Sequence, residues 1–541
     1  MRLPFPLLLS ITAFALPAQQ PADSAPATVD ARWRTEPIPD PRGIQGTVFL
    51  AGGGRLAPEL MAEFVRAAGG SRARIVVVPT ASASADDAGQ RDELAARWRQ
   101  QHAVTEVTVL HSRNRDESDS EAFTAPLRDA TGVWFGGGDQ QRIADAYLGT
   151  RFERELHAVL QRGGAVGGTS AGAAIGSRTM IAGGRAVPEL ATGFDLVPGA
   201  VIDQHFSQRS RMPRLQQALA AVPGRFGIGI DEGTALALNG RRLRAVGSGN
   251  VHVLLPRTDH HPERVVALAA GDTLDLPTWQ RAARNRTLGP WPVARRIEPS
   301  LAKGALVIVG GGALPEEITA RFVALAGGTK ARIVFVSGAE TLPLERDPPV
   351  IARFREHGAQ AVSRLDHRHP DEWNDEAREL VAGATGIWFG GGRQWRLCDA
   401  YDGTDAVSAF HGVLERGGVI GGSSAGATIQ GDHLVRGNPL GNTDMWCEGY
   451  DRGFAFLRGV AIDQHFLARN RMADLTAFVE RFPQVLGIGI DEATAAVVEG
   501  ERLEVLGDSK VVLLRKRALE PLEPMVLARG QQVDLRTLAP R

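Results

Sequence analysis

The stretch RFERELHAVLQRGGAVGGTSAGA, residues 151–173, joins a helical pattern to a turn made of small residues. Apolar residues recur along one helix face at Phe152, Leu156, Val159 and Leu160. Gly163 follows them, so the pattern predicts an amphipathic helix with a glycine C-cap. The segment GGTSAGA then has the spacing of a strand-to-helix turn that lifts a serine above a sheet. Together these patterns predict an α/β fold.

Short apolar runs rich in β-branched residues, such as ARIVVVP at 73–79, alternate along the chain with helical patterns. These runs lack the polar alternation of a strand that has one solvent face. The sheet is therefore expected to be mostly parallel and covered by helices on both faces. In such sheets, functional sites form at the carboxyl ends of the strands.

The chain contains two copies of this pattern. Five segments recur in the same order: TVFLAGGG (47–54) and LVIVGGG (306–312), ARIVVVPTA (73–81) and ARIVFVSGA (331–339), TGVWFGGGDQQR (131–142) and TGIWFGGGRQWR (385–396), VIDQHF (201–206) and AIDQHF (461–466), GIGIDEGTA (227–235) and GIGIDEATA (487–495). At 541 residues, the chain also exceeds what one hydrophobic core usually serves. We therefore expect tandem domains at 45–280 and 303–541, joined by a linker at 281–302.

The first residues, MRLPFPLLLSITAFALPAQQ, have the pattern of a secretory signal. Arg2 supplies a basic start, an apolar core too short to span a bilayer follows, and Ala18 suits cleavage. We expect a signal peptide at 1–18, a Pro- and Ala-rich linker at 19–44, and a mature protein that is secreted or periplasmic. An uncleaved interfacial anchor is the alternative.

The composition is nearly neutral, with 61 lysine and arginine residues against 62 aspartate and glutamate residues. This balance does not favour nucleic acid or an anionic membrane as a partner. The two cysteines, Cys398 and Cys447, could form a disulfide in an oxidising compartment or remain structural thiols. No cofactor is implied, and the isolated histidine pairs give little support for a metal site.

Both halves carry a G-x-S-x-G turn, with Ser170 at its centre in the first and Ser424 in the second. A serine at such a turn can act as a nucleophile, and the next backbone N–H, of Ala171 or Ala425, can stabilise an oxyanion. The glycine-rich turns after TGVWF and TGIWF could supply further N–H donors, at Gly137, Gly138, Gly391 and Gly392. The alternative for each turn is a packing device between strand and helix.

A serine nucleophile needs a base, usually a histidine oriented by a carboxylate. Four histidine pairs recur at matching places: His205/His465, His157/His411, His102/His357 and His111/His367. The first pair ends the strand-like runs PGAVIDQH and RGVAIDQH and is favoured, with a structural role as the alternative. The favoured carboxylates, Glu232 and Glu492, close the apolar run GIGIDE. Their rivals, Asp203 and Asp463, lie too close to the histidine in sequence to orient its ring freely.

The segments GGGDQ, GGTSAGA, VIDQHFSQRSRMPRL and GIGIDE, in this order, resemble cyanophycinase and its wider peptidase family, which includes the aspartyl dipeptidases. The resemblance covers each repeat nearly end to end. It implies a three-layer α/β/α, flavodoxin-like fold related to class I glutamine amidotransferases, and a Ser-His-Glu arrangement that hydrolyses peptide bonds next to aspartate. Cyanophycinase itself cleaves a poly-aspartate whose side chains carry arginine. The implied catalytic sets are Ser170, His205 and Glu232, and Ser424, His465 and Glu492.

The resemblance also implies substrate-binding residues around each set. They are Gln140, Asp203, Gln204, Arg209, Arg211 and Arg214 in the first half, and Gln394, Asp463, Gln464, Arg469 and Arg471 in the second. Guanidinium groups pair well with the carboxylates of an aspartyl substrate, whereas a solvated helix face is the alternative. The second half departs at Arg393, which replaces Asp139, and at Asp474, which replaces Arg214 and reverses a charge in the expected cleft.

The sequence therefore predicts an exported serine hydrolase that cleaves aspartate-containing peptides, either cyanophycin or β-aspartyl peptides, through an acyl-enzyme. The alternatives are an aspartyl dipeptidase acting on Asp-X dipeptides and a non-catalytic binding protein on the same fold. An α/β-hydrolase esterase is disfavoured, because that fold places its acid before its histidine, whereas Glu232 follows His205. The second domain is expected either to be active with an altered preference or to serve mainly as the partner in an intramolecular pseudo-dimer.

Overall fold

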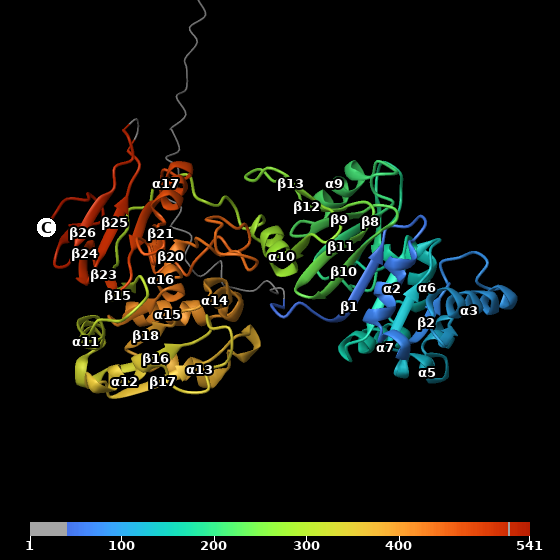
Figure 1. The fold of residues 1–541 in the computed structure, drawn as a ribbon, viewed down its shortest axis with the longest axis horizontal. Helices are drawn as coiled ribbons and strands as arrows, with labels where there is room; N and C mark the ends of the chain where they lie inside the picture. Colours follow the sequence, from blue (N-terminus) through green and yellow to red (C-terminus); the bar gives the residue numbers. More distant parts are fainter. Residues whose placement is uncertain (1–39, 518–519) are drawn as a thin grey trace, which may run out of the picture.

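The computed structural model describes residues 40–517 and 520–541, which form two halves of similar architecture (Figure 1). The expected signal peptide at 1–18 and most of the expected linker at 19–44 lie outside these residues. Across the described part of the chain, no helix combines the length and the apolar character needed to cross a membrane.

An eight-stranded sheet forms the centre of the first half. Its strands are β1 (Ile44–Ala51), β2 (Arg74–Val78), β3 (Glu106–Val109), β4 (Gly132–Phe135), β5 (Ala165–Thr169), β10 (Thr234–Gly240), β11 (Arg242–Gly247) and β14 (Thr273–Asp275). They lie in the order β14-β11-β10-β1-β5-β4-β2-β3. The run from β1 to β3 is parallel, as expected, whereas β10, β11 and β14 extend the sheet in antiparallel fashion.

Helices cover both faces of this sheet. They are α2 (Pro58–Ala67), α3 (Ala88–His102), α4 (Arg115–Ser118), α5 (Glu121–Asp129), α6 (Gln140–Tyr147), α7 (Arg151–Gln161) and α8 (Ala171–Ala174), with the short η1 (Gly70–Arg72). Val48 of β1 belongs to one hydrophobic cluster with Phe152 of α7, and its neighbour Phe49 belongs to another with Phe64 of α2. Because successive strand residues point to opposite faces, the sheet is buried on both sides. The amphipathic helix predicted near residues 152–163 is α7.

A second sheet, which the sequence did not reveal, carries the histidine and glutamate motifs. It consists of β8 (Ala200–Gln204), β9 (Phe226–Ile230), β12 (Val251–Leu255) and β13 (Arg264–Leu268), beside a hairpin of β6 (Thr179–Gly183) and β7 (Glu189–Thr192). Ile202 and Ile228 join the cluster that contains Val48, while Leu215 of α9 (Met212–Ala221) covers the other face. The expected fold, a mostly parallel sheet covered by helices, is confirmed, and a second sheet that was not expected packs against the first.

The second half repeats this plan. Its main sheet has the order β17-β16-β18-β19-β15-β23-β24-β27, and its second sheet the order β20-β21-β22-β25-β26. The strands are β15 (Ala305–Val309), β16 (Arg332–Val336), β17 (Ala361–Leu365), β18 (Gly386–Phe389), β19 (Val419–Ser423), β20 (Gly431–His433), β21 (Leu457–Gln464), β22 (Leu486–Ile490), β23 (Thr494–Glu499), β24 (Arg502–Gly507), β25 (Lys510–Leu514), β26 (Met525–Ala528) and β27 (Gln532–Asp534). The helices are α11 (Glu316–Leu325), η2 (Gly328–Lys330), α12 (Pro349–Glu356), η3 (Pro370–Glu372), α13 (Asp375–Ala382), α14 (Gln394–Tyr401), α15 (Ala406–Glu415), α16 (Ala425–Thr428) and α17 (Met472–Arg481).

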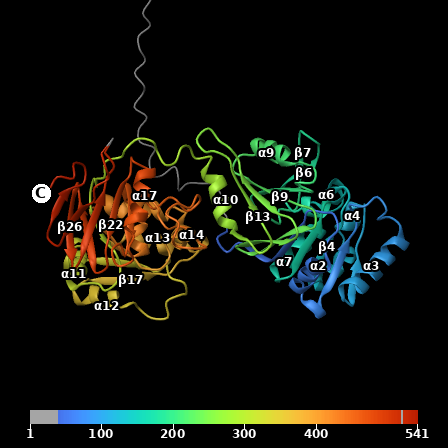
Figure 2. The ribbon, with the colours of Figure 1, turned by 45° about the horizontal axis from the view of Figure 1, so that its top comes forward.

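The helix α10 (Leu276–Asn285) lies between the halves (Figure 2). Arg281, 2 % exposed, forms an ion pair with Asp402 and donates through Nη2 to the Cys398 carbonyl at 3.0 Å. Arg286 Nε donates to Glu448 Oε1 at 2.6 Å. The expected linker at 281–302 therefore begins inside a buried helix, because α10 caps the first half and docks on the second at once.

The contacts between the halves come from unlike surfaces. The first half contributes α10, Arg241 between β10 and β11, and Arg42, whereas the second contributes α14, Asp371 and the segment that holds Glu448 and Tyr450. The counterpart of α14 in the first half is α6, which lies on the side away from α10 in both ribbon views (Figures 1 and 2). These contacts do not follow the two-fold relation of a pseudo-dimer, so that arrangement remains a prediction. Cys398 and Cys447 are not joined in a disulfide.

Candidate active site

Ser170 lies on a strained turn between β5 and α8. Its backbone has φ +55° and ψ −110°, a conformation that residues other than glycine rarely adopt. Strand and helix approach so closely that a Cβ on Gly168 would lie 2.4 Å from the Gly172 carbonyl oxygen. Ser424, between β19 and α16, has φ +57° and ψ −112°. The turn therefore fixes a serine in the same strained position in each half.

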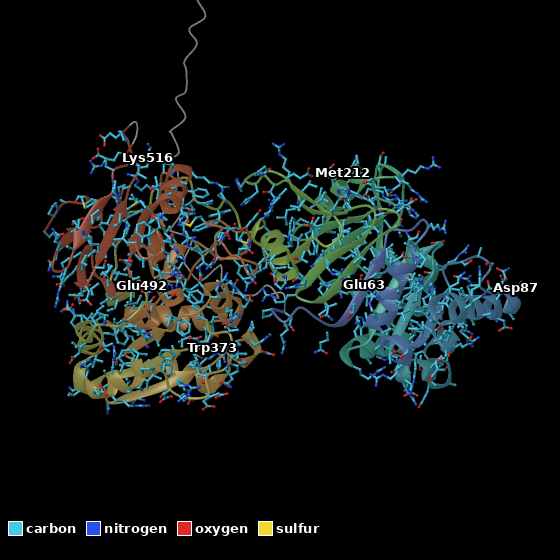
Figure 3. The ribbon with its side chains drawn as sticks, viewed as in Figure 1. Glu63, Asp87, Met212, Trp373, Glu492 and Lys516 are labelled. Carbon is cyan, nitrogen blue, oxygen red and sulfur yellow. The ribbon has the colours of Figure 1, made fainter. Side chains whose placement is uncertain are left out.

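A hydrogen-bonded chain joins three side chains in each half. Ser170 Oγ lies 2.9 Å from His205 Nε2, and His205 Nδ1 lies 2.6 Å from Glu232 Oε1. The same two distances are 3.0 Å and 2.6 Å in the set Ser424, His465 and Glu492 (Glu492 is labelled in Figure 3). With the ring proton on Nδ1 and donated to the carboxylate, Nε2 is left to accept the serine hydroxyl proton. Each serine thus has a histidine placed where it could act as a base, and each histidine has a carboxylate placed to orient it.

The glycines after β1 position the histidine and the glutamate. His205 follows β8 with φ +47°, and its backbone N–H donates to the Gly52 carbonyl at 2.7 Å. A Cβ on Gly53 would lie 2.2 Å from His205 Cε1, and one on Gly54 would lie 2.9 Å from Glu232 Oε2. These glycines therefore form the wall against which the pair packs. In the second half the same wall is made by Gly311 and Gly312.

Burial lowers the pKa of His205 below the ordinary value of 6.5, against the opposing effect of the hydrogen bond that His205 donates to Glu232. The positive charge of Arg209 lowers this pKa further. The pKa of His465 is lowered in the same way, with burial as the largest cause. A histidine with a pKa below 6.5 is neutral at pH 7, which is the state that a general base requires.

Two of the expected oxyanion donors in the first half, Ala171 and Gly137, lie beside Ser170. Ala171 is the first residue of α8, so its N–H has no partner within the helix. A Cβ on Gly137 would lie 3.4 Å from Ser170 Cβ, so this glycine borders the nucleophile. Gly138 follows with φ +140°, a conformation that favours glycine. The equivalent positions in the second half are Ala425, Gly391 and Gly392.

Gln140 and Gln394 are buried and bound to backbone rather than open to the cleft. Gln140 Nε2 donates to two carbonyls of β6, at 2.8 Å each. Gln394 Nε2 donates to the carbonyls of Val435 and Arg436, also at 2.8 Å. The amide nitrogens that we expected to contact substrate therefore hold the chain segment that follows the serine helix.

Asp203 anchors an ion-pair cluster two residues before the histidine. It is 1 % exposed, and it accepts hydrogen bonds from Arg214 Nε at 2.9 Å and from Arg211 Nη1 at 3.2 Å. Arg211 also donates to Gln204 Oε1 at 2.6 Å. Arg209, in contrast, is exposed. Asp203 and Arg214 are thus bound to each other, and Arg209 is the guanidinium of this group that meets solvent.

The second half builds the same cluster with a different arginine. Asp463 is 0 % exposed and accepts from Arg471 Nη1 at 3.0 Å and from Arg436 Nε at 2.9 Å. Arg436 stands where Ala182 stands in the first half, because the equivalent glutamine donates to the carbonyl of each. The buried aspartate of the second half is therefore paired with an arginine that follows β20, whereas Arg214 of the first half lies in α9.

This geometry corrects the expectation that Asp474 and Arg393 change the charge of the cleft in the second half. Asp474 does not leave a bare negative charge in place of Arg214, because its Oδ2 accepts from Arg436 Nη2 at 2.8 Å. Arg393 does not place a bare positive charge beside the serine, because its Nη2 donates to the Asn438 carbonyl at 2.7 Å and to the Gly441 carbonyl. Asp474 is neutralised by the Arg436 side chain, and Arg393 is bound by the loop that contains Asn438 and Gly441. The first half lacks both this arginine and this loop.

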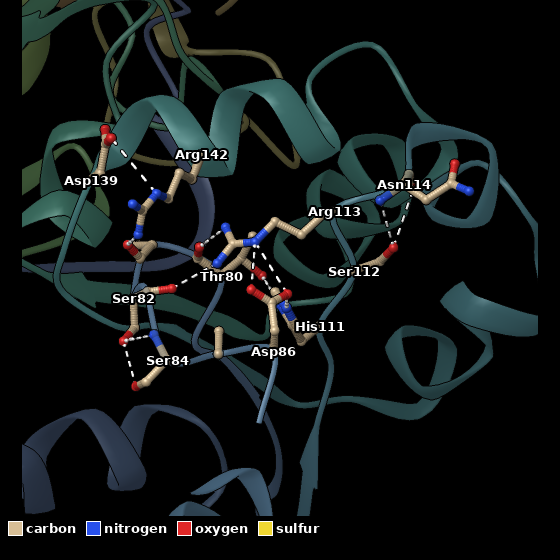
Figure 4. Close-up of polar contacts among 12 residues, drawn as sticks. Thr80, Ser82, Ser84, Asp86, His111, Ser112, Arg113, Asn114, Asp139 and Arg142 are labelled. Carbon is tan, nitrogen blue, oxygen red and sulfur yellow. Dashed lines mark hydrogen bonds and ion pairs between the residues drawn. The ribbon is translucent and has the colours of Figure 1, made fainter. Parts of the chain in front are cut away.

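Two of the other recurring histidines, His111 and His357, make structural contacts. His111 lies between Thr80 Oγ1 and Asp86 Oδ1, 2.9 Å from each (Figure 4). His357 Nε2 lies 2.9 Å from Thr319 Oγ1. The favoured pair His205/His465 is the one that the fold brings to the serines.

Sequence reasoning missed two parts of the site. It quoted the repeated glycines at 52–54 and 310–312 but assigned them no role, although their recurrence at the end of the first strand was a usable signal. It also missed Arg436, and there no signal was available, because the first half has an alanine at that place and the partner carboxylate is distant in sequence.

Comparison of the sequence with known proteins identifies a family. The sequence profile described as Peptidase family S51 matches residues 48–246 and 295–506, one segment in each half. A cyanophycinase of Nostoc sp. is 35% identical over 229 residues, covering 40% of this chain and 76% of the relative. A cyanophycinase of Geminocystis herdmanii is 33% identical over 224 residues, covering 40% of this chain and 82% of the relative.

Two solved structures also align with part of the chain. One is a peptidase from an acI-B1 Actinobacterium, with 24% identity and a TM-score of 0.35, covering 43% of this chain and 98% of that chain. The other is a putative peptidase E protein from Listeria monocytogenes EGD-e, with 16% identity and a TM-score of 0.30, covering 38% and 100%. The family profile and the cyanophycinase sequences carry the assignment: the chain belongs to peptidase family S51 and is a serine-type peptidase.

Proposed function

We propose that this chain is exported and hydrolyses aspartate-containing peptides through acyl-enzymes formed on both Ser170 and Ser424. The observation that carries the proposal is the Ser-His-Glu chain, whose serine–histidine distance is 2.9 Å in one half and 3.0 Å in the other. The aspartate-containing substrate follows from the cyanophycinases among the relatives. Export follows from the signal pattern in the first eighteen residues.

The geometry supports a two-step acyl transfer. As Ser170 Oγ attacks the scissile carbonyl, His205 Nε2 takes the hydroxyl proton, and Glu232 stabilises the imidazolium that forms. The tetrahedral oxyanion accepts hydrogen bonds from the N–H groups of Ala171 and the Gly137 turn. The imidazolium then protonates the leaving nitrogen, and the C–N bond breaks. Water, deprotonated by the same histidine, releases the acyl group and restores the serine.

The ion pair between Arg436 and Asp463 is the reason that we propose activity for the second half as well as for the first. A buried aspartate left without its arginine would be costly, and it would disturb the strand that carries the histidine. Arg436 removes that cost by pairing with Asp463, which precedes His465 by two residues. The second half therefore keeps the charge balance behind its histidine as well as the triad itself.

The proposal is tested by offering the purified chain three substrates side by side: cyanophycin, β-Asp-Arg and a set of Asp-X dipeptides. Mass spectrometry of the products separates a polymer-cleaving enzyme from an Asp-X dipeptidase, which is the second candidate. The chain with both Ser170→Ala and Ser424→Ala controls for contaminating peptidases. Equal release by this control, or no release from any substrate, would overturn the assignment.

A further inference from the structure

A pocket of about 230 Å³ opens beside the nucleophile of the first half. Its wall includes Gly137, the glycine whose Cβ position lies 3.4 Å from Ser170 Cβ and 3.9 Å from Ser170 Oγ. Gly137 thus lies between the pocket and Ser170. Its volume falls below the usual range for drug-sized ligands, so it suits a group about the size of one amino acid.

The pocket has an apolar floor and a polar rim. Val77 of β2, Trp134 of β4 and Trp98 of α3 form the floor, and each is at most 5 % exposed. The rim carries the hydroxyls of Ser82 and Ser84, the amide of Gln90, and the guanidinium groups of Arg91 and Arg97. No carboxylate is among the described residues that line it. The chemistry of the rim therefore selects for a carboxylate rather than a cation.

The two rim arginines are placed differently. Arg91 Nη1 donates to the Ala85 carbonyl at 2.8 Å, which fixes its guanidinium at the edge of the pocket. Arg97 is half exposed, and its nearest carboxylate partner is Glu93, at 3.9 Å. Arg97 therefore keeps most of its hydrogen-bonding capacity for a bound anion, and its substitution should leave the fold intact.

The part of the rim that carries Ser82 and Ser84 is held in place by Arg113. Arg113 donates through Nη1 to the Thr80 carbonyl and through Nη2 to the Ser82 carbonyl, both at 2.7 Å (Figure 4). Asp87, labelled in Figure 3, does not line the pocket but caps α3, the helix that carries Gln90, Arg91 and Arg97, by accepting from the Gln90 N–H. The rim is thus fixed before any ligand arrives, which reduces the entropic cost of binding.

The second half places larger side chains at the equivalent positions. Phe335 stands where Val77 stands in the first half, and its Cζ lies 3.0 Å from the Cβ position of Gly390. At the equivalent Gly136, the nearest atom is 3.8 Å away. Leu344 packs on the cluster that contains Phe335. Glu340 and Leu342 replace Ser82 and Ser84, which adds a negative charge and removes two hydroxyls.

Sheet order shows which part of a substrate meets the pocket. The strands run β1-β5-β4-β2, with the histidine packed over the glycines after β1, the serine after β5, and the pocket beyond β4 and β2. The leaving nitrogen must reach His205 Nε2 to be protonated, so it lies on the β1 side of the serine. The opposite side, toward the pocket, is left for the acyl portion.

We propose that this pocket is an acyl-side subsite of the first half, that it takes an amino-acid-sized group ending in a carboxylate, and that the second half lacks it. The proposal rests on the hydrolytic function proposed above. It predicts that the two halves differ in how strongly they require a free carboxylate on the acyl residue.

The test compares an aspartyl peptide with its counterpart in which the acyl-side carboxylate is an amide. In the chain with Ser424→Ala, kcat/KM should favour the free carboxylate by about tenfold, the size of one charge-assisted hydrogen bond. Arg97→Gln should remove this preference through KM, because kcat/KM for the free carboxylate should fall much further than kcat/KM for the amide. In the chain with Ser170→Ala, no such preference is expected.

Two matched substitutions exchange the residues that occupy equivalent positions, Val77 in the first half and Phe335 in the second. Val77→Phe in the first half should abolish the preference, and Phe335→Val is the control for the second. If Val77→Phe unfolds the chain, Arg97→Gln still decides, because that side chain is exposed. Equal preference in both halves, or a loss by Arg97→Gln that is the same for both substrates, would overturn the subsite.

A binding measurement separates the subsite from the proposed hydrolysis. In the chain with both Ser170→Ala and Ser424→Ala, calorimetry with the same peptide pair should show one site that prefers the carboxylate and loses that preference with Arg97→Gln. That pattern without turnover in the unsubstituted chain would support the pocket and reject the hydrolysis. Turnover without that pattern would do the reverse.

Discussion

The two halves keep one part of the site unchanged and rebuild another. The Ser-His-Glu distances differ by 0.1 Å or less between them, at 2.9 and 3.0 Å for one contact and 2.6 Å in both for the other. The ion pair on the aspartate before the histidine, however, uses Arg214 from α9 in one half and Arg436 in the other. The triad is held by glycine walls that tolerate no added atom, whereas the aspartate requires only a nearby guanidinium, which can come from another element.

The largest expected effect tests whether both halves are enzymes. Ser170→Ala and Ser424→Ala should each remove the turnover of one half by roughly 10³-fold or more, because the nucleophile is lost. Total activity should persist in each single variant and disappear in the double variant. Steady-state rates with an aspartyl peptide measure this, and intact mass after brief turnover locates the acyl group. Full loss from one single substitution would show that the other half is inactive.

A second test asks whether the glycine wall is equally strict in both halves. Gly53→Ala in the Ser424→Ala chain, and Gly311→Ala in the Ser170→Ala chain, each place a Cβ 2.2 Å from a histidine Cε1. The imidazole must move by about 1 Å, and kcat should fall by about 10²-fold in each half.

Gly163→Ala is the control for backbone strain, since Gly163 has φ +87° and nothing within 4 Å of its Cβ position. This change should lower thermal stability without lowering kcat. A small effect of Gly53→Ala in one half, beside a large effect of Gly311→Ala in the other, would mean that the histidines are not held alike.

The Ser-His-Glu sets that the structure brings together could be predicted because identical side chains recur in both halves at the ends of strands. Burial and pairing could not be predicted in the same way. Asp203 and Arg214 follow a pattern that suggested substrate contacts, yet the fold buries them against each other. The runs VIDQHF and GIGIDE look like any buried strand, so nothing in them showed that they form a second sheet. The helix α10 was likewise divided by an expected boundary, because its buried arginines resemble linker residues until the second half is placed against them.

A third test replaces Arg436 by an arginine at position 474, which is equivalent to Arg214 in the first half. Arg436→Ala, in the Ser170→Ala chain, leaves Asp463 with one of its two arginines, and breaking a buried pair costs about 3 kcal/mol. Thermal unfolding should show this loss, and kcat should fall by about tenfold as the strand before His465 shifts. Adding Asp474→Arg should restore both, because it recreates the arrangement made by Arg214. Failure of this rescue would show that the two clusters are not equivalent.

The smallest expected effect concerns the pH at which each half becomes active. The base must be neutral, so kcat/KM should fall as pH drops through the histidine pKa, which lies below 6.5 in both halves. Arg209 and Arg469 contribute positive charges that lower these pKa values. Arg209→Gln, in the Ser424→Ala chain, removes one such charge and stabilises the imidazolium. The histidine pKa should therefore rise, and the acid limb should move to higher pH by a few tenths of a unit.

Arg469→Gln in the Ser170→Ala chain is the matched variant and should shift its limb in the same direction. Because both arginines are exposed, raising the salt concentration should shrink each shift. A shift to lower pH, or one that salt does not reduce, would mean that these arginines act on the histidines through structure rather than through charge. A shift in one half alone would instead show that His205 and His465 differ in how strongly the nearby arginine affects their pKa, although the two triads share the same geometry.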